Sequence, residues 1–176
     1  MKTAGRKIFI IAIGMLLGVF ALQPAHAAFG YHAAQKAVVK KIAKKGFATS
    51  RMKAHARFGK GVYLSSRPAT AMAEARGARG IVRFRTGKGF QKRTLDVSRP
   101  NPGRLHRMFP GKDLRGSVKK GVVGPKLGKS IGRYASRKGK VVRYRSARVP
   151  GAYNYYVPKK VYEAHPRMLR HPQVLK

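Results

Sequence analysis

The sequence predicts an α+β fold, and three observations support this prediction. Short strands in which apolar and basic residues alternate are interspersed with amphipathic helices, without a regular strand–helix–strand rhythm. Apolar residues make up 43% of the chain, which is enough for one packed core. The chain has no cysteine, so disulfides, thiolate metal sites and cysteine nucleophiles are excluded.

The N-terminus has the pattern of a cleavable signal peptide. Basic residues precede the apolar run of residues 8–22, and the small-x-small triplet 25–27 follows it. This run is shorter than the roughly 20 residues that span a bilayer. We therefore expect cleavage after Ala27 and a secreted or periplasmic protein. Its mature part is predicted to have a single domain at 28–162 and a polar basic tail at 163–176.

Periodicity and turn residues predict the elements of the first half of this domain. Residues 36–45 place apolar side chains on one helical face and lysines on the other, and Gly46 follows at a helix C-cap position. The full series is a strand at 29–34, a helix at 36–45, an exposed loop at 50–57, a strand at 62–64, a helix from Pro68 to Gly77 capped by Ser66, and a strand at 81–85.

The second half is predicted with less regularity. Residues 98–126 are rich in Pro, Gly and Lys, and they are longer than a normal connection, so they are predicted to form a mobile loop or to contain short helices. The other predictions are a turn at 87–89, a strand returning at 93–97, a helix at 127–135, strands at 140–146 and 152–157, and a frayed end from Glu163.

The charge of the chain is strongly one-sided. It has 41 Lys and Arg residues against four Asp and Glu residues, a formal charge of +37 at pH 7. Such an excess opposes compaction through self-repulsion, and a polyanionic partner relieves it. We predict that nucleic acid or an envelope polyanion binds this protein. The candidate binding residues are Lys40, Lys44, Arg83, Arg85, Arg143 and Arg145.

Residues 30–77 carry the most informative motifs. They contain Gly30-Tyr31-His32-Ala33, the amphipathic helix, and then the glycine-flanked segment Phe58-Gly-Lys-Gly-Val-Tyr-Leu-Ser65 before a helix after Pro68. This order resembles the ADP-ribosyltransferase superfamily, particularly its bacterial toxin branch with a His-Tyr pattern. Residues 142–158 also resemble the last strands of that fold.

The resemblance implies a split, bent β-sandwich that grips NAD in a cleft. It implies that His32 contacts the nicotinamide ribose, that the backbone at Ala33 holds the carboxamide, and that Tyr63 packs on the nicotinamide ring. The implied NAD-binding residues are Tyr31, His32, Ala33, Phe58, Gly59, Gly61, Tyr63 and Ser65. From the residues alone, His32 and Tyr63 fit buried core positions as well.

The third catalytic position departs from the family pattern. Active members carry a Glu on a late strand, and Asn154 stands at the matching position here. An amide can hydrogen-bond a ribose hydroxyl, but it supplies no negative charge to a sugar that becomes cationic. A carboxylate at ~4 Å contributes several kcal/mol in a partly dry site. Glu74 and Glu163 are the possible substitutes, although their spacing does not single either out.

Two other functions stay open at this point. A secreted, metal-independent ribonuclease toxin needs an acid, a base and a cation, which His32, His55 or His106 with Lys and Arg can supply. A non-enzymatic cationic binder with a degenerate transferase fold needs no catalytic group, and its binding collapses as salt rises. The six histidines show no metal-ligand spacing, so no metal is predicted. Both toxin hypotheses imply a neutralising partner, for which an acidic protein fits the charge.

Overall fold

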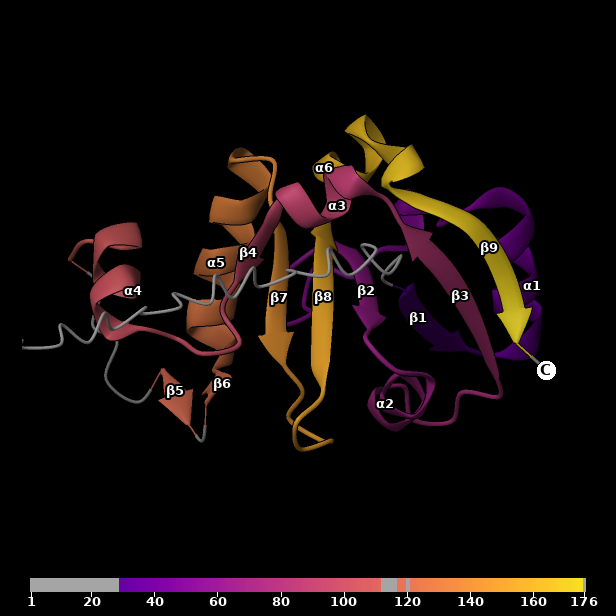
Figure 1. Ribbon diagram of the computed structural model, residues 1–176, viewed down its shortest axis with the longest axis horizontal. Helices are drawn as coiled ribbons and strands as arrows, with labels where there is room; N and C mark the ends of the chain where they lie inside the picture. The colour runs from indigo at the N-terminus through magenta and orange to yellow at the C-terminus, as the bar shows by residue number, and fades with distance from the viewer. Residues whose placement is uncertain (1–28, 112–116, 120, 176) are drawn as a thin grey trace, which may run out of the picture.

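The computed structural model describes residues 29–111, 117–119 and 121–175 (Figure 1). The predicted signal peptide therefore lies outside the described residues. In chain order the elements are β1 Phe29–Ala34, α1 Lys36–Lys45, η1 Thr49–Arg51, β2 Gly61–Ser65, α2 Pro68–Glu74, β3 Gly80–Thr86, α3 Lys88–Lys92, β4 Thr94–Asp96, α4 Pro102–Met108, β5 Val118–Lys119, β6 Val122–Val123, α5 Pro125–Arg137, β7 Val141–Arg145, β8 Tyr153–Pro158, α6 Lys159–Ala164, η2 Pro166–Met168 and β9 Leu169–Leu175.

A seven-stranded mixed sheet organises the described chain, and the predicted α+β class is confirmed. Its strand order is β4-β7-β8-β2-β1-β3-β9, and a separate hairpin pairs β5 with β6. All neighbours in the large sheet are antiparallel except β4 and β7. Six helices and two 3-10 turns accompany the strands among the described residues.

The sheet is weakest between β1 and β2, where a single residue pair, Tyr31 with Ser65, joins the two strands. On its other side, β1 pairs with β3 along all six of its residues. β2 likewise pairs with β8 along all five of its residues. The two halves of the sheet therefore separate at β1 and β2, which is the split that the resemblance implies.

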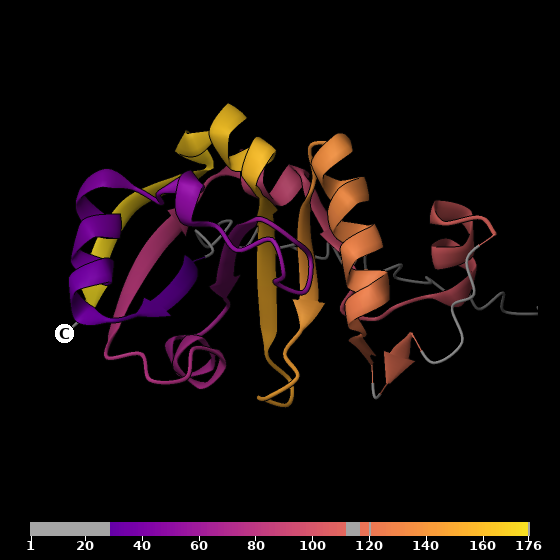
Figure 2. The ribbon, with the colours of Figure 1, turned by 180° about the vertical axis from the view of Figure 1, so that it is seen from behind.

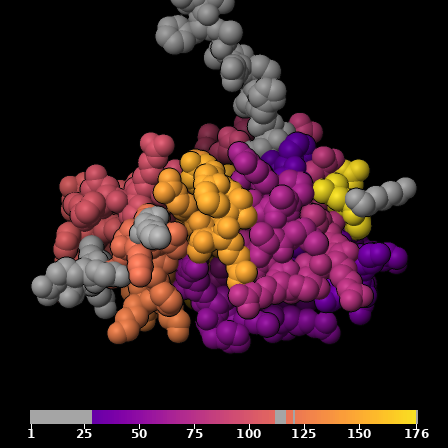
Figure 3. Space-filling model, turned by 90° about the horizontal axis from the view of Figure 1, so that it is seen from below, coloured from indigo at the N-terminus to yellow at the C-terminus, as the bar shows by residue number. Residues whose placement is uncertain are grey.

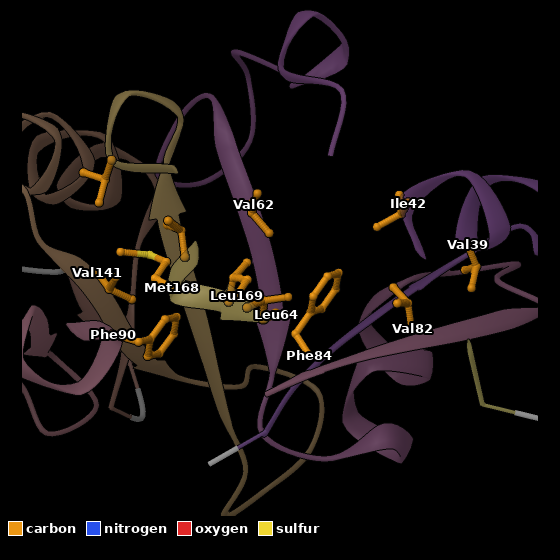
Figure 4. Close-up of a cluster of buried hydrophobic side chains, with 12 residues drawn as sticks. Val39, Ile42, Val62, Leu64, Val82, Phe84, Phe90, Val141, Met168 and Leu169 are labelled. Atoms are coloured by element: carbon orange, nitrogen blue, oxygen red, sulfur yellow. The ribbon is translucent and has the colours of Figure 1, made fainter. Parts of the chain in front are cut away.

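One buried cluster packs α1 against the β3 side of the sheet. Val39 and Ile42 of α1 face Val82 and Phe84 of β3, as Figure 4 shows. Leu64 of β2 belongs to the same cluster. The helix forms because its apolar residues recur on one face, while its lysines stay exposed to solvent.

A second buried cluster packs α5 against β7 and β8. Ile131 of α5 is completely buried together with Val142 of β7, and Tyr156 of β8 lies beside them. Val142 pairs with Tyr156 across the two strands, so both side chains point to the same face. The two clusters together form the apolar core that the composition predicts.

Two sequence predictions need correction here, and a third is confirmed. Residues 93–97 do not return to β3, because residues 88–92 form α3 and β4 then pairs in parallel with β7. The prediction that residues 98–126 contain short helices is confirmed by α4, and the β5–β6 hairpin, which was not predicted, lies in the same stretch. Ser66 does not cap α2. Its hydroxyl accepts the Tyr153 N–H instead.

The segment predicted to be a frayed tail is part of the fold. β9 pairs with β3 from Leu169 to Leu175, with a bulge, and Met168 and Leu169 are buried in the first cluster. β9 is an edge strand whose residues 170–174 are all exposed, so its sequence lacks the alternation of a half-buried strand and resembles a loose end. Among the described residues, no helix is long and apolar enough to cross a membrane.

Candidate functional site

The imidazole of His32 bridges the two strands at the split. Its Nδ1 donates to the Tyr63 carbonyl oxygen at 2.9 Å, and its ring meets Phe47 edge-on at 5.1 Å between centroids. Because a carbonyl only accepts, Nδ1 carries the proton, and Nε2 remains an acceptor in the neutral ring. Burial lowers the pKa of His32 below 6.5, partly opposed by the backbone hydrogen bond. The ring is therefore neutral at pH 7.

Tyr63 fixes the glycine-flanked segment that precedes it. Its hydroxyl donates to the Gly59 carbonyl at 3.0 Å and accepts the Phe58 N–H at 3.0 Å. Its ring lies 5.1 Å from that of Tyr156. Burial raises the pKa of Tyr63 to about 12, so the phenol is neutral. The side chain thus presents ring surface and holds a turn, with its hydroxyl already engaged on both sides.

Three of the predicted NAD-binding residues have structural roles in this turn. Phe58 is buried between the rings of Tyr144 and Tyr156. Gly59 has φ +104°, which side-chain-bearing residues rarely adopt. A Cβ at Gly61 would lie 2.3 Å from the Val157 carbonyl oxygen. Phe58 therefore packs in the core, and the two glycines allow the turn and the close backbone packing.

Glu74, the last residue of α2, places a carboxylate next to the Asn154 side chain. The Asn154 side-chain N–H donates to Glu74 Oε1 at 3.0 Å, and the Ser146 hydroxyl donates to the same oxygen at 2.6 Å. Ser65 donates in turn to the Asn154 carbonyl oxygen at 2.7 Å. Ser65, Asn154 and Ser146 are buried. This chain of hydrogen bonds fixes one carboxylate oxygen at the start of β8.

The loop between β7 and β8 closes around this carboxylate. Arg148 lies 3.8 Å from Glu74 Oε2 through its Nε, and both side chains remain partly exposed. The Ser146 hydroxyl accepts the N–H groups of Arg148 and Val149, at 3.1 and 3.0 Å, which fixes the loop beside it. Figure 3 shows this loop, in orange, against the magenta segment that includes α2.

Two cavities meet at the split. The smaller, of about 220 Å³, is lined by Tyr31, Ala33, Tyr63, Ser65, Glu74 and Asn154, with His32, Leu64, Ala71, Ala75 and Tyr144. The larger, of about 790 Å³, lies between α1, residues 46–56 and the start of β2. His32 and Tyr63 line both cavities. The structure therefore brings together the predicted residues Tyr31, His32, Ala33, Tyr63, Ser65 and Asn154.

The larger cavity has an apolar interior and a cationic rim. Ile42, Phe47, Met52 and Val62 are among its apolar lining residues. Lys41, Lys45, Arg51 and Lys53 also line it and are exposed, and no carboxylate is among its described lining residues. Apolar walls with a cationic edge suit a ring system that carries phosphates.

The six predicted polyanion-binding residues do not gather on one surface. Lys40 and Lys44 lie on α1 and are exposed. Arg83 and Arg85 lie on β3, which three strands separate from β7 with Arg143 and Arg145. Arg143 is engaged locally, by Asp96 at 3.3 Å and by the Tyr153 ring at 4.0 Å.

The histidines proposed for a ribonuclease are dispersed. His106 lies on α4, which Figure 1 places at the opposite end of the molecule from β1 and His32. His55 is exposed and lines neither cavity at the split. No group of three His, Cys, Asp or Glu residues that suits a metal ion occurs in the described part of the chain.

The sequence alone does not decide whether Glu74 or Glu163 substitutes for the missing late-strand carboxylate. Glu163, the other, is on α6, where it pairs with Lys159 at 3.6 Å and does not line the site. A signal for Glu74 exists in α2, since Ala71, Glu74 and Ala75 share one helical face behind the Tyr63 strand. The signal is a single Glu among small residues, on the helix face that packs against the strand of Tyr63.

Comparison with known proteins gives one result. Residues 22–174 match the family model of the RES domain, which covers most of the chain. Neither the curated proteins nor the solved structures contain a match.

Proposed function

The chain belongs to the RES-domain family, whose fold is ADP-ribosyltransferase-like and NAD-binding, and on this premise we propose that it transfers ADP-ribose from NAD to a macromolecular target. The observation that carries the proposal is the Glu74 carboxylate, held by Asn154 and Ser146 in a cavity beside Tyr63 and His32. The family match supports an NAD-related transferase, and the target is our proposal alone.

The two cavities suit a dinucleotide that lies across the split. A volume of about 220 Å³ is below the range of ordinary ligand pockets, so the smaller cavity accepts only part of NAD. We assign the nicotinamide end to it, next to Glu74, and the ADP end to the larger cavity. The exposed rim cations Lys41 and Lys45 are then available to the pyrophosphate.

Each residue of the smaller cavity has a role that its present contacts support. Tyr63 offers a ring face, and the neutral His32 offers Nε2 as an acceptor for a ribose hydroxyl. The chemistry that NAD supplies is a glycosidic bond whose electron pair leaves with neutral nicotinamide, while a nucleophile bonds to C1′ and gives its proton to solvent. Glu74 stabilises the positive charge on the sugar side of that bond.

The magnitude is sufficient for catalysis. A unit charge pair about 4 Å apart interacts by about 4 kcal/mol at an effective dielectric constant of 20. Asn154 supports this role by donating to Glu74 Oε1, so the amide positions the carboxylate instead of replacing it. The arrangement thus supplies the negative charge that the late strand itself lacks.

We further propose that the protein acts outside the cytoplasm as a toxin or effector. The signal-peptide pattern of residues 1–27 supports export, and the charge of +37 supports a polyanionic target such as nucleic acid. A toxin of this kind needs a neutralising partner in the cell that makes it. An acidic protein fits, because complementary charge accelerates and orients association.

Nicotinamide release by the purified mature protein tests the transferase proposal. We expect Glu74→Gln to reduce this rate by about 100-fold or more, which corresponds to about 2.7 kcal/mol of barrier. NAD affinity should change little, because the amide keeps the shape of the side chain. Glu163→Gln is the matched control and should release nicotinamide at the wild-type rate.

Two results would count against the proposal. Equal turnover by wild type and Glu74→Gln would remove the carboxylate from the mechanism. No nicotinamide release by wild type, and no label transfer from NAD to any target, would remove the transferase and favour the non-enzymatic binder of polyanions.

A further inference from the structure

The face of β1, β3 and β9 next to the split carries aromatic and cationic side chains in rows. Tyr31 pairs with Arg83, which pairs with Gln173, and Phe29 pairs with Arg85, which pairs with Arg170. Residues paired across neighbouring strands point to the same face of the sheet. We call this set of six residues the arginine face: Phe29, Tyr31, Arg83, Arg85, Arg170 and Gln173.

Side-chain contacts confirm that these residues share one face. The Arg83 guanidinium lies over the Phe29 ring, 4.6 Å from its centroid, and donates to the Gln173 side-chain oxygen. Phe29 nevertheless keeps 38% of its surface exposed, although it is a large apolar residue. Arg85, Arg170 and Gln173 are exposed as well. An aromatic ring and cations are therefore presented together to solvent.

The helix that packs on this part of the sheet covers the other face. Val39 and Ile42 of α1 contact the cluster of Val82 and Phe84, which alternate along β3 with the arginines. Figure 2 shows α1 in front of β9, and in Figure 1, seen from the opposite side, β3 and β9 lie in front of α1. The arginine face is thus turned away from α1.

The arginine face connects two cavities. At one end, Tyr31 also lines the smaller cavity with Glu74. At the other end, Arg170 lines a cavity of about 720 Å³ together with Lys88, Arg93, Arg167 and His165. No carboxylate is among the described lining residues of that cavity. A cationic path therefore leads along β3 and β9 to the residue that borders the reaction site.

We infer that the arginine face binds single-stranded nucleic acid and presents it to the smaller cavity as the acceptor of ADP-ribose. The inference rests on the proposed function for its acceptor role, but not for binding. Exposed aromatic rings beside cations suit unpaired bases, because every base has a face that stacks and every phosphate a charge that pairs. In the transfer, a base nitrogen or oxygen bonds to C1′ and loses a proton to solvent, while nicotinamide leaves.

General charge alone does not account for this arrangement. α1 carries more cations than the arginine face, five lysines against three arginines, yet it contains no aromatic residue. The arginine face combines a half-exposed ring, two rows of polar groups and contact with the site. A purely electrostatic binder would use the lysine face of α1 and the arginine face equally. Variants of α1 are therefore the control for variants of the arginine face.

Fluorescence anisotropy with labelled 12-nucleotide DNA and RNA measures the binding. We expect R85E/R170E to bind at least tenfold more weakly and to lose about 1.4 from the slope of log K against log salt, as for two single-strand phosphate contacts. K40E/K44E on α1 changes the net charge equally and should weaken binding by less than about threefold. R85Q/R170Q, a milder change, should rank between wild type and R85E/R170E.

A second variant separates base stacking from charge. Phe29→Ala should weaken binding of the 12-mers by about tenfold, which is within the range for one stacked base. It should leave the affinity for polyphosphate unchanged, because that polymer has no bases. Equal losses in both Glu double variants, or no effect of Phe29→Ala on the 12-mers, would overturn the inference.

Label transfer separates this inference from the proposed function. With labelled NAD, wild type should modify the 12-mers, and R85E/R170E should modify them at least tenfold less while still releasing nicotinamide to water. Transfer to proteins and never to the 12-mers would overturn the acceptor assignment alone. If the variants differ in affinity for the 12-mers as expected but wild type releases no nicotinamide, the proposed transferase activity is wrong and the proposed binding surface stands.

Discussion

Glu74 is one of three acidic residues among the described residues, and each of the three lies beside a cation. Asp96 pairs with Arg143 and Glu163 with Lys159, at exposed positions. Glu74 differs because two buried side chains, Asn154 and Ser146, also donate to it, at 3.0 and 2.6 Å. Two neutral donors orient a carboxylate without cancelling its charge, and such a carboxylate is suited to stabilising a nearby cation.

His32 is the residue whose protonation couples the site to stability. Its pKa is lowered in the folded state by burial, so the unfolded chain binds the proton more readily. The neutral ring is fully compatible with folding above pH 6.5, and stability is lost as the pH falls below 6.5 towards the lower folded pKa.

We therefore expect the denaturant midpoint of wild-type unfolding to be lower at pH 5 than at pH 7.5. The decrease should be smaller for His32→Gln. The glutamine retains an N–H donor for the Tyr63 carbonyl but does not titrate in this range. Denaturant unfolding at each pH measures the effect, and exposed His55 supplies the control His55→Gln. Identical pH profiles for wild type and His32→Gln would contradict the assignment of the lowered pKa.

At the scale of elements, α5 packs closer to the backbone of Arg57 and Phe58 than a helix with side chains at the contact could. Gly128 and Gly132 are four residues apart on the same face of α5. A Cβ at Gly132 would lie 1.8 Å from the Phe58 carbonyl oxygen, and one at Gly128 would lie 2.8 Å from that of Arg57. The packing of α5 thus fixes the position of residues 57 and 58, which precede Tyr63.

Gly132→Ala should therefore destabilise the protein by about 3 kcal/mol or more, because the clash is with backbone that cannot rotate away. Gly89→Ala in α3 is the control, since its Cβ would meet nothing within 4 Å. Alanine is the better helix former there, and we expect a gain of about 0.5–1 kcal/mol. Chemical denaturation measures both, and a neutral Gly132→Ala would disprove the close packing of α5.

At the scale of the whole molecule, the charge of +37 is the dominant feature. The fold spreads cations over α1, β3, β7 and the cavity beside α3, so repulsion acts across the entire body. The core must therefore offset a destabilising field in addition to conformational entropy.

Added salt should stabilise the protein for this reason. The Debye length falls from about 30 Å at 0.01 M to about 3 Å at 1 M, which screens repulsion between exposed cations. We expect Tm in 0.5 M NaCl to exceed Tm in 0.01 M NaCl by several degrees, at about 2–4 °C for each kcal/mol gained. Scanning calorimetry measures this shift, with an osmolarity-matched glucose buffer as control. A Tm that falls with NaCl would contradict the repulsion.

The local elements followed from the sequence because each buries one face. The boundaries of β1 and α1 were predicted at 29–34 and 36–45, and β3 and β8 were placed within one residue or two. Alternation and helical periodicity report which side of an element is buried, and this information is local. The family resemblance implies that Tyr63 and His32 both contact the nicotinamide end of NAD, and this predicts that the two residues lie close together.

The tertiary structure alone decided which of these elements meet. Glu74 and Asn154 are 80 residues apart, and their contact depends on how α2 packs against the sheet. The same holds for β4 beside β7 and for β9 on the edge of β3. Periodicity shows that a face is buried but not what buries it, because partner choice depends on the packing free energy of the whole core.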